Sequence, residues 1–159
     1  VDTRYVQTAP GSTALMVKAP RPGLEPEVIY YRSQSVMAQS DLSGLAEEAL
    51  NGASVLYLTG ITPALSASCR KAFLNWIDVA ERKGIPIWFD PNHRRKLWSD
   101  EDARELLVPL LPRFTGVMAG KDEAEMLLKS SGSATELATL LHQKGVQHAI
   151  IKDGEHGSC

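Results

Sequence analysis

The residues best suited to chemistry stand together in the segment D-P-N-H-R-R-K, which directly follows a short apolar run at residues 85–89. A β-branched and aromatic run of this kind, bounded by glycine and by Asp-Pro, predicts a strand that is buried on both faces of a sheet. Open α/β sheets bind ligands just beyond the carboxyl ends of their strands, so residues 90–96 would lie where a substrate binds. Arg94 and Arg95 suit planar anions such as carboxylate or phosphate. A solvated basic turn is the alternative interpretation of the same charges.

Length, charge and cysteine content narrow the class of protein. The chain has 159 residues, of which 43% are hydrophobic, and this is enough for one domain with a hydrophobic core. The formal net charge is −2 with both signs interspersed, so we expect neither nucleic acid nor a membrane as a partner. No apolar run approaches the roughly 20 residues that cross a bilayer, and no signal-peptide pattern opens the sequence. Two cysteines make no disulfide framework, and we expect a cytoplasmic protein.

Both ends of the sequence indicate a longer chain. Val1 has no initiator methionine before it, and Cys159 follows a strand pattern and the start of a turn without a closing helix. We therefore expect residues 1–159 to be one partial domain.

Two short strand patterns at residues 13–17 and 28–32 come first in the chain. Between them, residues 18–27 contain three prolines and a glycine, which is a turn signal. This arrangement predicts a projecting antiparallel hairpin, or lid, over residues 12–33.

The returning strand of this hairpin carries an aromatic residue and a cation on one face. Because side chains alternate along a strand, Tyr30 and Arg32 share a face and Tyr31 points to the other. That face would cover a polar ligand, or it would serve only for cross-strand packing with an exposed arginine.

The rest of the chain alternates between strand and helix patterns. Strands are expected at residues 55–58, 85–89, 114–118 and 146–152, and helices are expected to begin near Leu42, Ser66 or Ser68, Ser99, Lys121 and Ser133. Strands that alternate with helices of about 10–15 residues form right-handed crossovers and a parallel sheet. The predicted fold is therefore α/β, a three-layer sandwich in which helices flank a parallel sheet, with a small antiparallel β lid near the N-terminus.

Polar clusters follow each of the four predicted strands, at residues 59–62, 90–95, 120–123 and 152–157. The carboxyl ends of parallel strands meet at one edge of a sheet. Four clusters at one edge therefore favour a ligand site over scattered surface charge.

These segments resemble the ribokinase-like, or PfkB-type, carbohydrate kinases. L-T-G-I-T-P-A-L-S precedes F-D-P-N-H-R-R-K-L-W-S, and V-I-Y-Y-R-S-Q-S, D-E-A-E-M-L and I-I-K-D-G-E-H-G occur in the expected order. The resemblance spans all 159 residues, and D-x-N-x-R followed by L-W is its specific part. The most similar branch is that of the 2-keto-3-deoxygluconate kinases.

The resemblance implies transfer of the γ-phosphoryl group of ATP, with Mg²⁺, to a primary hydroxyl of a sugar acid. In that branch the positions matching Tyr30, Arg32 and Arg94 contact the substrate, and the backbone at Ile61 lines its pocket. A substrate with one carboxylate and several hydroxyls needs an arginine fork and a tyrosine hydroxyl, so the chemistry agrees with this assignment. A homo-oligomer formed through the lid is a further expectation.

The resemblance also assigns the nucleotide side of the site. Lys152 and Gly154 match a strand-end loop near the nucleotide. Glu123 matches the glutamate of an N-x-x-E motif that organises Mg²⁺ and phosphates, although Gly120 stands where that motif has asparagine. Phosphoryl transfer depends mainly on positioning and charge stabilisation, so carboxylates and cations near the phosphates are expected.

The catalytic residues of the family lie in a G-A-G-D segment that does not occur in these 159 residues. We therefore expect no catalytic residue within this chain and no kinase activity from this piece alone. Asp90 is interpreted as a structural or positioning acid rather than the base. His93 is interpreted as a surface residue, because the motif offers it no partner.

Other functions remain open from the sequence. The chain could come from a kinase of another sugar in the same family, such as fructose or a nucleoside. It could be a non-catalytic sugar-binding module that kept the pocket, or an unrelated α/β enzyme that acts on another phosphorylated ligand. Arg94 and Arg32 favour an acidic substrate over a neutral one.

Overall fold

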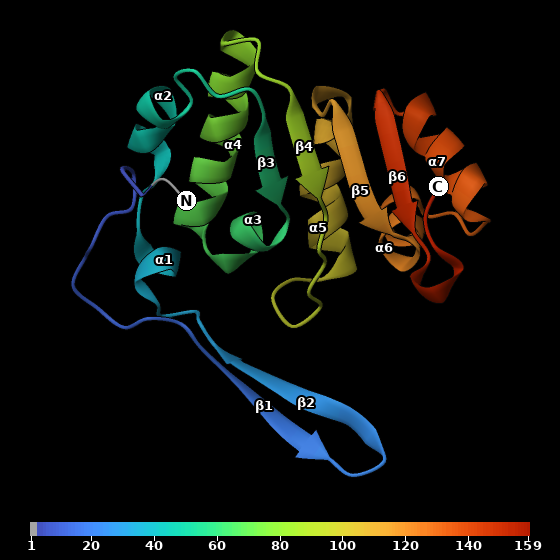
Figure 1. The fold of residues 1–159 in the computed structure, drawn as a ribbon, viewed down its shortest axis with the longest axis horizontal. Coiled ribbons are helices and arrows are strands. Elements are labelled where there is room, and N and C mark those ends of the chain that lie inside the picture. Colours follow the sequence, from blue (N-terminus) through green and yellow to red (C-terminus); the bar gives the residue numbers. More distant parts are fainter. Residues whose placement is uncertain (1–2) are drawn as a thin grey trace.

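The computed structural model describes residues 3–159, which form an α/β body and a β-hairpin that projects from it (Figure 1). The body contains four strands: β3 (Leu56–Thr59), β4 (Ile87–Asp90), β5 (Gly116–Gly120) and β6 (His148–Lys152). All of them pair in parallel, and their order in the sheet is their order in the chain. The predicted parallel sheet with four neighbouring strands is therefore confirmed.

Helices precede and connect these strands. They are α1 (Val36–Gln39), α2 (Ala46–Ala49), α3 (Ile61–Leu65), α4 (Ala67–Arg82), α5 (Asp100–Leu107), α6 (Lys121–Leu128) and α7 (Ala134–Gln143), with 3₁₀ turns at Ser43–Leu45, Val108–Arg113 and Gly154–His156. No helix of the described chain is both long and apolar enough to span a bilayer.

Serine caps determine where four of these helices begin. Ser35, Ser66, Ser99 and Ser133 each accept a hydrogen bond from the backbone N–H three residues later, which satisfies a donor that the first turn leaves unpaired. The helix expected after Leu42 is present, as a 3₁₀ turn at Ser43–Leu45 that runs directly into α2 and ends before Asn51 and Gly52. Ahead of it, Asp41 accepts the N–H of Ser43.

The hairpin consists of β1 (Leu15–Arg21) and β2 (Leu24–Tyr31), paired antiparallel. The prediction of a ten-residue turn at residues 18–27 is wrong. The chain reverses within Pro22 and Gly23, where the glycine has a φ of 74°. Strand structure continues through Pro20 and Pro26. A two-stranded ribbon has an unpaired edge on each strand, where a missing N–H removes no ladder hydrogen bond. The separate antiparallel element itself is confirmed.

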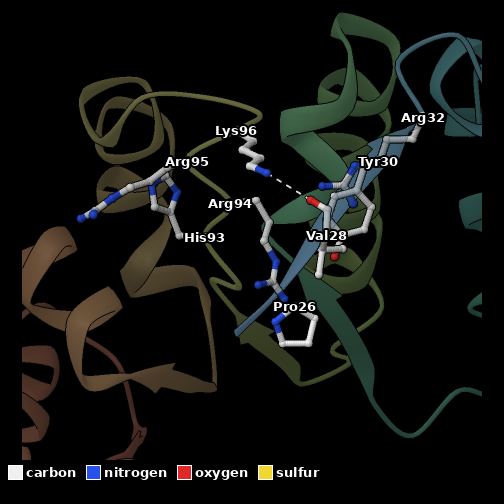
Figure 2. A pocket seen from close by; sticks show the side chains of 8 residues that line it. All are labelled: Pro26, Val28, Tyr30, Arg32, His93, Arg94, Arg95 and Lys96. Carbon is white, nitrogen blue, oxygen red and sulfur yellow. Dashed lines mark hydrogen bonds between the residues drawn. The ribbon is translucent and has the colours of Figure 1, made fainter. Parts of the chain in front are cut away.

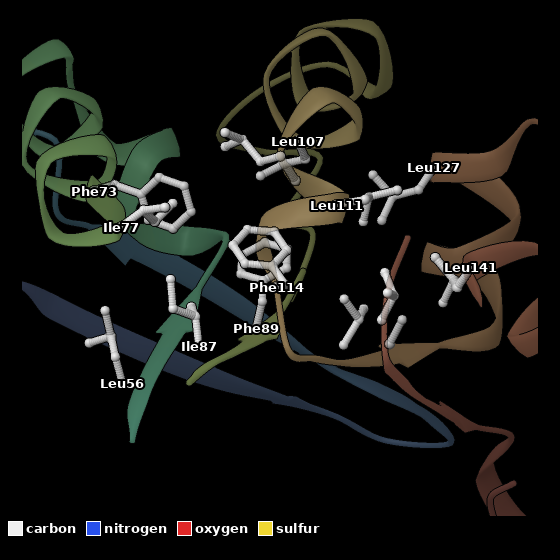
Figure 3. Close-up of a cluster of buried hydrophobic side chains, with 14 of the residues drawn as sticks. Leu56, Phe73, Ile77, Ile87, Phe89, Leu107, Leu111, Phe114, Leu127 and Leu141 are labelled. Carbon is white, nitrogen blue, oxygen red and sulfur yellow. The ribbon is translucent and has the colours of Figure 1, made fainter. Parts of the chain in front are cut away.

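The core lies between the sheet and the connecting helices (Figure 3). Phe89 of β4 is fully buried at its centre, stacked on Phe114 with centroids 4.6 Å apart and in edge contact with Phe73 of α4 at 6.0 Å. Aromatic pairs in these geometries add to the stabilisation that burial alone provides. This packing fixes the strand whose carboxyl end carries the D-P-N-H-R-R-K segment.

The described helices cover one face of the sheet. Because strands that follow one another in the chain are neighbours and such crossovers are right-handed, the connecting helices fall on one side, and α4 and α5 lie behind the strands in Figure 1. On the opposite face Tyr57 is 55% exposed. Beside it Trp88 stacks on His148 across Gly116, with ring centroids 5.8 Å apart. A parallel sheet flanked by helices is thus confirmed, and residues 3–159 supply one helical layer.

The turns after β3 and β4 touch at Gly60. Its N–H donates to the Asp90 carbonyl at 2.9 Å, and a Cβ atom at this position would lie 2.1 Å from the Pro91 carbonyl oxygen. Only glycine allows the two turns to approach this closely, so Gly60 helps to place the residues that follow Asp90.

Gly60→Ala in the complete protein should lower the free energy of unfolding by about 1–3 kcal/mol, because the new methyl group forces a backbone shift. Urea unfolding monitored by tryptophan fluorescence measures this. Gly44→Ala is the control, since a Cβ there meets no atom within 4 Å. Equal unfolding midpoints for the two variants would contradict the proposed contact.

Candidate functional site

A cavity of about 460 Å³ lies between the hairpin and the segment after β4 (Figure 2). The hairpin and the segment are joined by a hydrogen bond of 3.1 Å from Lys96 Nζ to the carbonyl oxygen of Val28. The residues lining the cavity are Pro26, Val28, Tyr30, Arg32, His93, Arg94, Arg95 and Lys96. The structure therefore brings three predicted substrate residues, Tyr30, Arg32 and Arg94, to one cavity from segments about 60 residues apart in the sequence.

Tyr30 of β2 and Arg32, directly after the end of that strand, lie on the same side, as the alternation of side chains predicts. The guanidinium carbon of Arg32 lies 4.2 Å from the centre of the Tyr30 ring, a cation–π contact that orients the guanidinium plane. The Nε atom of Arg32 is buried and has no hydrogen-bond partner among the described residues. An unpaired buried N–H donor of this kind favours binding of a ligand that carries an acceptor.

Arg94 and Arg95 point in different directions, as expected for adjacent residues of a turn. Arg95 binds the Asp100 carboxylate through Nε at 3.2 Å and Nη2 at 3.3 Å. Arg94 is exposed, extends toward Pro26 of the hairpin in Figure 2, and has no ion-pair partner within residues 3–159. No carboxylate belongs to the described lining, so the cavity has a net positive charge.

His93 is buried, and its interpretation as a surface residue is wrong. Its side chain is only 6% exposed, and Nε2 lies 2.8 Å from Oδ1 of Asp100. The ring packs near Trp98, with centroids 6.2 Å apart. The hydrogen bond from His93 lowers the pKa of Asp100; slight burial opposes this effect and Arg95 reinforces it. The partner that the motif did not show lies seven residues later, at the start of α5.

Asp90 connects three strands at the edge of the sheet. Its Oδ2 atom accepts hydrogen bonds from Lys152 Nζ at 2.9 Å and from the Tyr57 hydroxyl at 3.3 Å. Its Oδ1 atom accepts the N–H of Asn92 at 3.0 Å, where Asn92 takes a left-handed φ of 39°. These contacts agree with the interpretation of Asp90 as a positioning acid, because both oxygens are occupied in holding the turn.

Tyr57 and Lys152, the two side chains that donate to Asp90, both have a pKa raised above its ordinary value. Burial raises the pKa of the Tyr57 hydroxyl, and the adjacent Asp90 charge raises it further. Burial alone would lower the pKa of Lys152, but the hydrogen bond and charge of Asp90 outweigh it, and the pKa is raised. Lys152 is therefore a fixed cation at the end of β6. Sequence analysis missed Tyr57, although its period-two relation to Thr59 already placed it on the face that carries Asp90.

The other predicted site residues lie outside the lining of this cavity. Ile61 begins α3, where its N–H donates to Oγ1 of Thr59 at 3.4 Å. Lys152 faces Asp90, and Gly154 is exposed with a left-handed φ of 56°. The structure separates these residues from Tyr30, Arg32 and Arg94 but keeps them at the same edge of the sheet.

Glu123 clamps two turns together. One carboxylate oxygen accepts the N–H of Gly120 at 2.8 Å and the other accepts the N–H of His93 at 2.6 Å. Residues 3–159 contain no group of three His, Cys, Asp or Glu side chains that could hold a metal ion. Since both of its oxygens already bind backbone, Glu123 does not fit the role of a direct, unassisted magnesium ligand. An indirect role, through the remaining lone pairs, is compatible with the geometry.

Comparison with known families shows to which family this chain belongs. Residues 1–159 match the family model described as pfkB family carbohydrate kinase. The chain belongs to this family. The resemblance inferred from the motifs is therefore confirmed, and the PfkB fold explains why the polar turns gather at one edge of the sheet.

Relatives of this PfkB chain differ in the substrates that their names state. A 2-dehydro-3-deoxygalactonokinase of Haloferax volcanii is 32% identical and a 2-dehydro-3-deoxygluconokinase of Haemophilus influenzae 31%; the matches cover 89% and 82% of this chain but 44% and 43% of those proteins. A probable fructokinase-2 of Arabidopsis thaliana is 27% identical over 91% of this chain and 44% of that protein. The chain thus spans less than half the length of these relatives.

Solved structures show the same fold. A PfkB protein from Polaromonas superposes with a TM-score of 0.81 at 28% identity, covering 94% of this chain and 53% of that one. A putative ribokinase II from E. coli, solved in complex with ATP and Mg²⁺, superposes with a TM-score of 0.73 at 19% identity, covering 84% of this chain and 43% of that one. The second similarity concerns the fold alone.

Glu123→Gln should destabilise the complete kinase by about 1–3 kcal/mol, because an amide NH₂ would face a backbone N–H and leave it unpaired. Asp122→Asn is the matched control, as it removes the same charge from an exposed side chain in the same helical turn. Urea unfolding of the two variants measures the difference in their free energies of unfolding. If Glu123 acted mainly on the metal, Gln would change the magnesium dependence of activity and leave the unfolding midpoint unaltered.

Proposed function

We propose that the complete protein phosphorylates a sugar acid of the 2-keto-3-deoxygluconate type, with ATP and Mg²⁺, in the cytoplasm. The observation that carries the proposal is the charge of the cavity. Arg32, Arg94 and Lys96 meet there without a carboxylate in the described lining, and Arg32 has a buried donor without a partner. A planar carboxylate of the substrate would neutralise these cations and accept from both guanidinium groups.

The predicted site residues have distinct roles in this proposal. Arg94 and Arg32 hold the substrate carboxylate, and the Tyr30 hydroxyl donates to a polar group of the sugar. Asp90 fixes the turn that carries Arg94 and is not the base, because Lys152, the Tyr57 hydroxyl and the N–H of Asn92 occupy its oxygens. Ile61 would contribute backbone to the sugar pocket once the remainder of the protein closes it.

ATP and Mg²⁺ would bind at the ends of β5 and β6. Lys152 and Gly154 would lie beside the nucleotide, and Glu123 would act on the metal indirectly. The bound metal would neutralise charge on the phosphates that the protein holds in line for transfer.

A ketohexose kinase is the second candidate, supported by the relative named probable fructokinase-2. A neutral sugar would leave the cations of the cavity without a counter-charge, which is why we favour the acid. The two candidates predict different effects of removing Arg94.

Arg94→Ala in the complete kinase should reduce kcat/KM for 2-keto-3-deoxygluconate by roughly 2–4 kcal/mol of transition-state stabilisation, because a charge-assisted bidentate contact is lost. Arg94→Lys should recover only part of this, since an ammonium group cannot form the planar fork. The loss on fructose should be much smaller. Arg95→Ala is the control, because Arg95 pairs with Asp100 at the surface. Equal losses on the acid and on fructose would show that Arg94 does not bind a carboxylate.

Residues 1–159 alone should show no kinase activity, because the segment to which the family resemblance assigns the anion-binding helix end and the base is not among them. A coupled assay of ADP release with purified fragment and with complete protein tests this. Turnover by the fragment, in a preparation from which a host kinase has been excluded, would mean that the catalytic residues lie within this chain.

A further inference from the structure

His93 has a buried ring nitrogen without a hydrogen-bond partner. The residue lines the cavity of Figure 2, its side chain is more than nine-tenths buried, and Nδ1 makes no hydrogen bond with the described residues. Buried polar atoms are nearly always paired, so an unpaired one beside a cavity indicates a missing partner.

The other ring nitrogen determines the chemical character of Nδ1. Nε2 lies 2.8 Å from a carboxylate oxygen of Asp100, which has no proton to donate at neutral pH. Nε2 must therefore carry the hydrogen, and in the neutral ring Nδ1 is then an acceptor. The His93 backbone N–H bound to Glu123 fixes the ring's point of attachment as well.

Nδ1 has no acceptor near it among the described residues, so a hydrogen on this nitrogen would be unpaired. Arginine and lysine side chains are donors only, so Nδ1 is an acceptor in a lining that consists mostly of donors. Its lone pair would repel a carboxylate and bind a group that donates, such as a hydroxyl.

We propose that Nδ1 of His93 accepts a hydrogen bond from a hydroxyl group of the bound sugar acid while the arginines hold its carboxylate. This inference rests on the proposed function and adds His93 as a residue that recognises the polyol part of the substrate. Less than 1 Å² of Nδ1 is accessible, so contact requires a movement of the lining, in which Arg94 and Lys96 are exposed.

Two substitutions separate this contact from the structural bond to Asp100. His93→Gln keeps a polar group at the position of Nε2 and removes the acceptor at Nδ1. His93→Asn keeps a polar group at the position of Nδ1 and cannot reach Asp100. In the complete kinase, His93→Gln should lower kcat/KM for 2-keto-3-deoxygluconate about 10-fold, with an unfolding midpoint close to that of the wild type. His93→Asn should retain more activity and lose stability.

Analogues that each lack one hydroxyl group identify the donor. Against the analogue without the relevant hydroxyl, wild type and His93→Gln should have equal kcat/KM, whereas the other analogues should retain the 10-fold difference. Full activity of His93→Gln, or a loss of the same size on every analogue, would overturn the proposal. The proposed function would survive that result, because the selective loss of the acid in Arg94→Ala tests it independently.

Nitrogen-15 NMR of histidine-labelled complete kinase gives a readout that does not depend on activity. The resonance absent from His93→Gln should show a protonated Nε2 and an unprotonated Nδ1. Saturating 2-keto-3-deoxygluconate should shift the Nδ1 signal in the direction of an accepted hydrogen bond. An Nδ1 signal that does not change at saturation would contradict the contact.

Discussion

Asp90 and Glu123 hold the turn after β4 from its two ends, and the position of Arg94 depends on both. Asp90 binds the N–H of Asn92 within the turn and is itself fixed by Lys152. Glu123 reaches across from α6 to the N–H of His93. Hydrogen bonds between carboxylates and backbone N–H groups are among the stronger ones in proteins. They allow a segment without regular secondary structure to keep one conformation at the edge of the sheet.

Of the two arginines in this turn, only Arg95 has an ion-pair partner among the described residues. Asp100 binds His93 and Arg95, which neutralises the side of the turn that faces α5. Arg94 receives no such partner among residues 3–159 and faces the hairpin. The two adjacent arginines therefore differ in their contacts, because Asp100 is positioned to reach only Arg95. The charge of the cavity follows from this local arrangement and not from the net charge of the chain.

Sequence patterns predicted the elements that depend on local interactions. Helix α6 begins and ends where its pattern indicated, and the caps at Ser99 and Ser133 form as expected, since each involves residues three apart. Contacts between distant segments were not predictable in this way. The bond from Glu123 to His93 joins residues 30 apart, and the partner of Lys152 lies 62 residues earlier. Both depend on the order of the strands in the sheet.

Two sequence predictions, for His93 and for the prolines of the hairpin, were wrong because they considered only the local segment. His93 looked unpartnered because its acid belongs to the next helix, and the strand prolines looked like turn residues because a two-stranded ribbon tolerates them. Tyr30, Arg32 and Arg94, which the family resemblance grouped as substrate residues, line one cavity. The resemblance could not indicate that Glu123 would have both oxygens engaged by backbone.

The order of the strands bears on how this chain folds. The order of β3, β4, β5 and β6 in the sheet is the order in which they are synthesised. Each new strand therefore docks beside the one made just before it. Contacts between segments near in sequence form fast, so the sheet can grow strand by strand as it leaves the ribosome. Within residues 3–159 the face with Tyr57 and Trp88 is not covered by a helix (Figure 1), and Tyr57 is 55% exposed. An exposed aromatic surface of this kind favours association with other apolar surfaces while the sheet is growing.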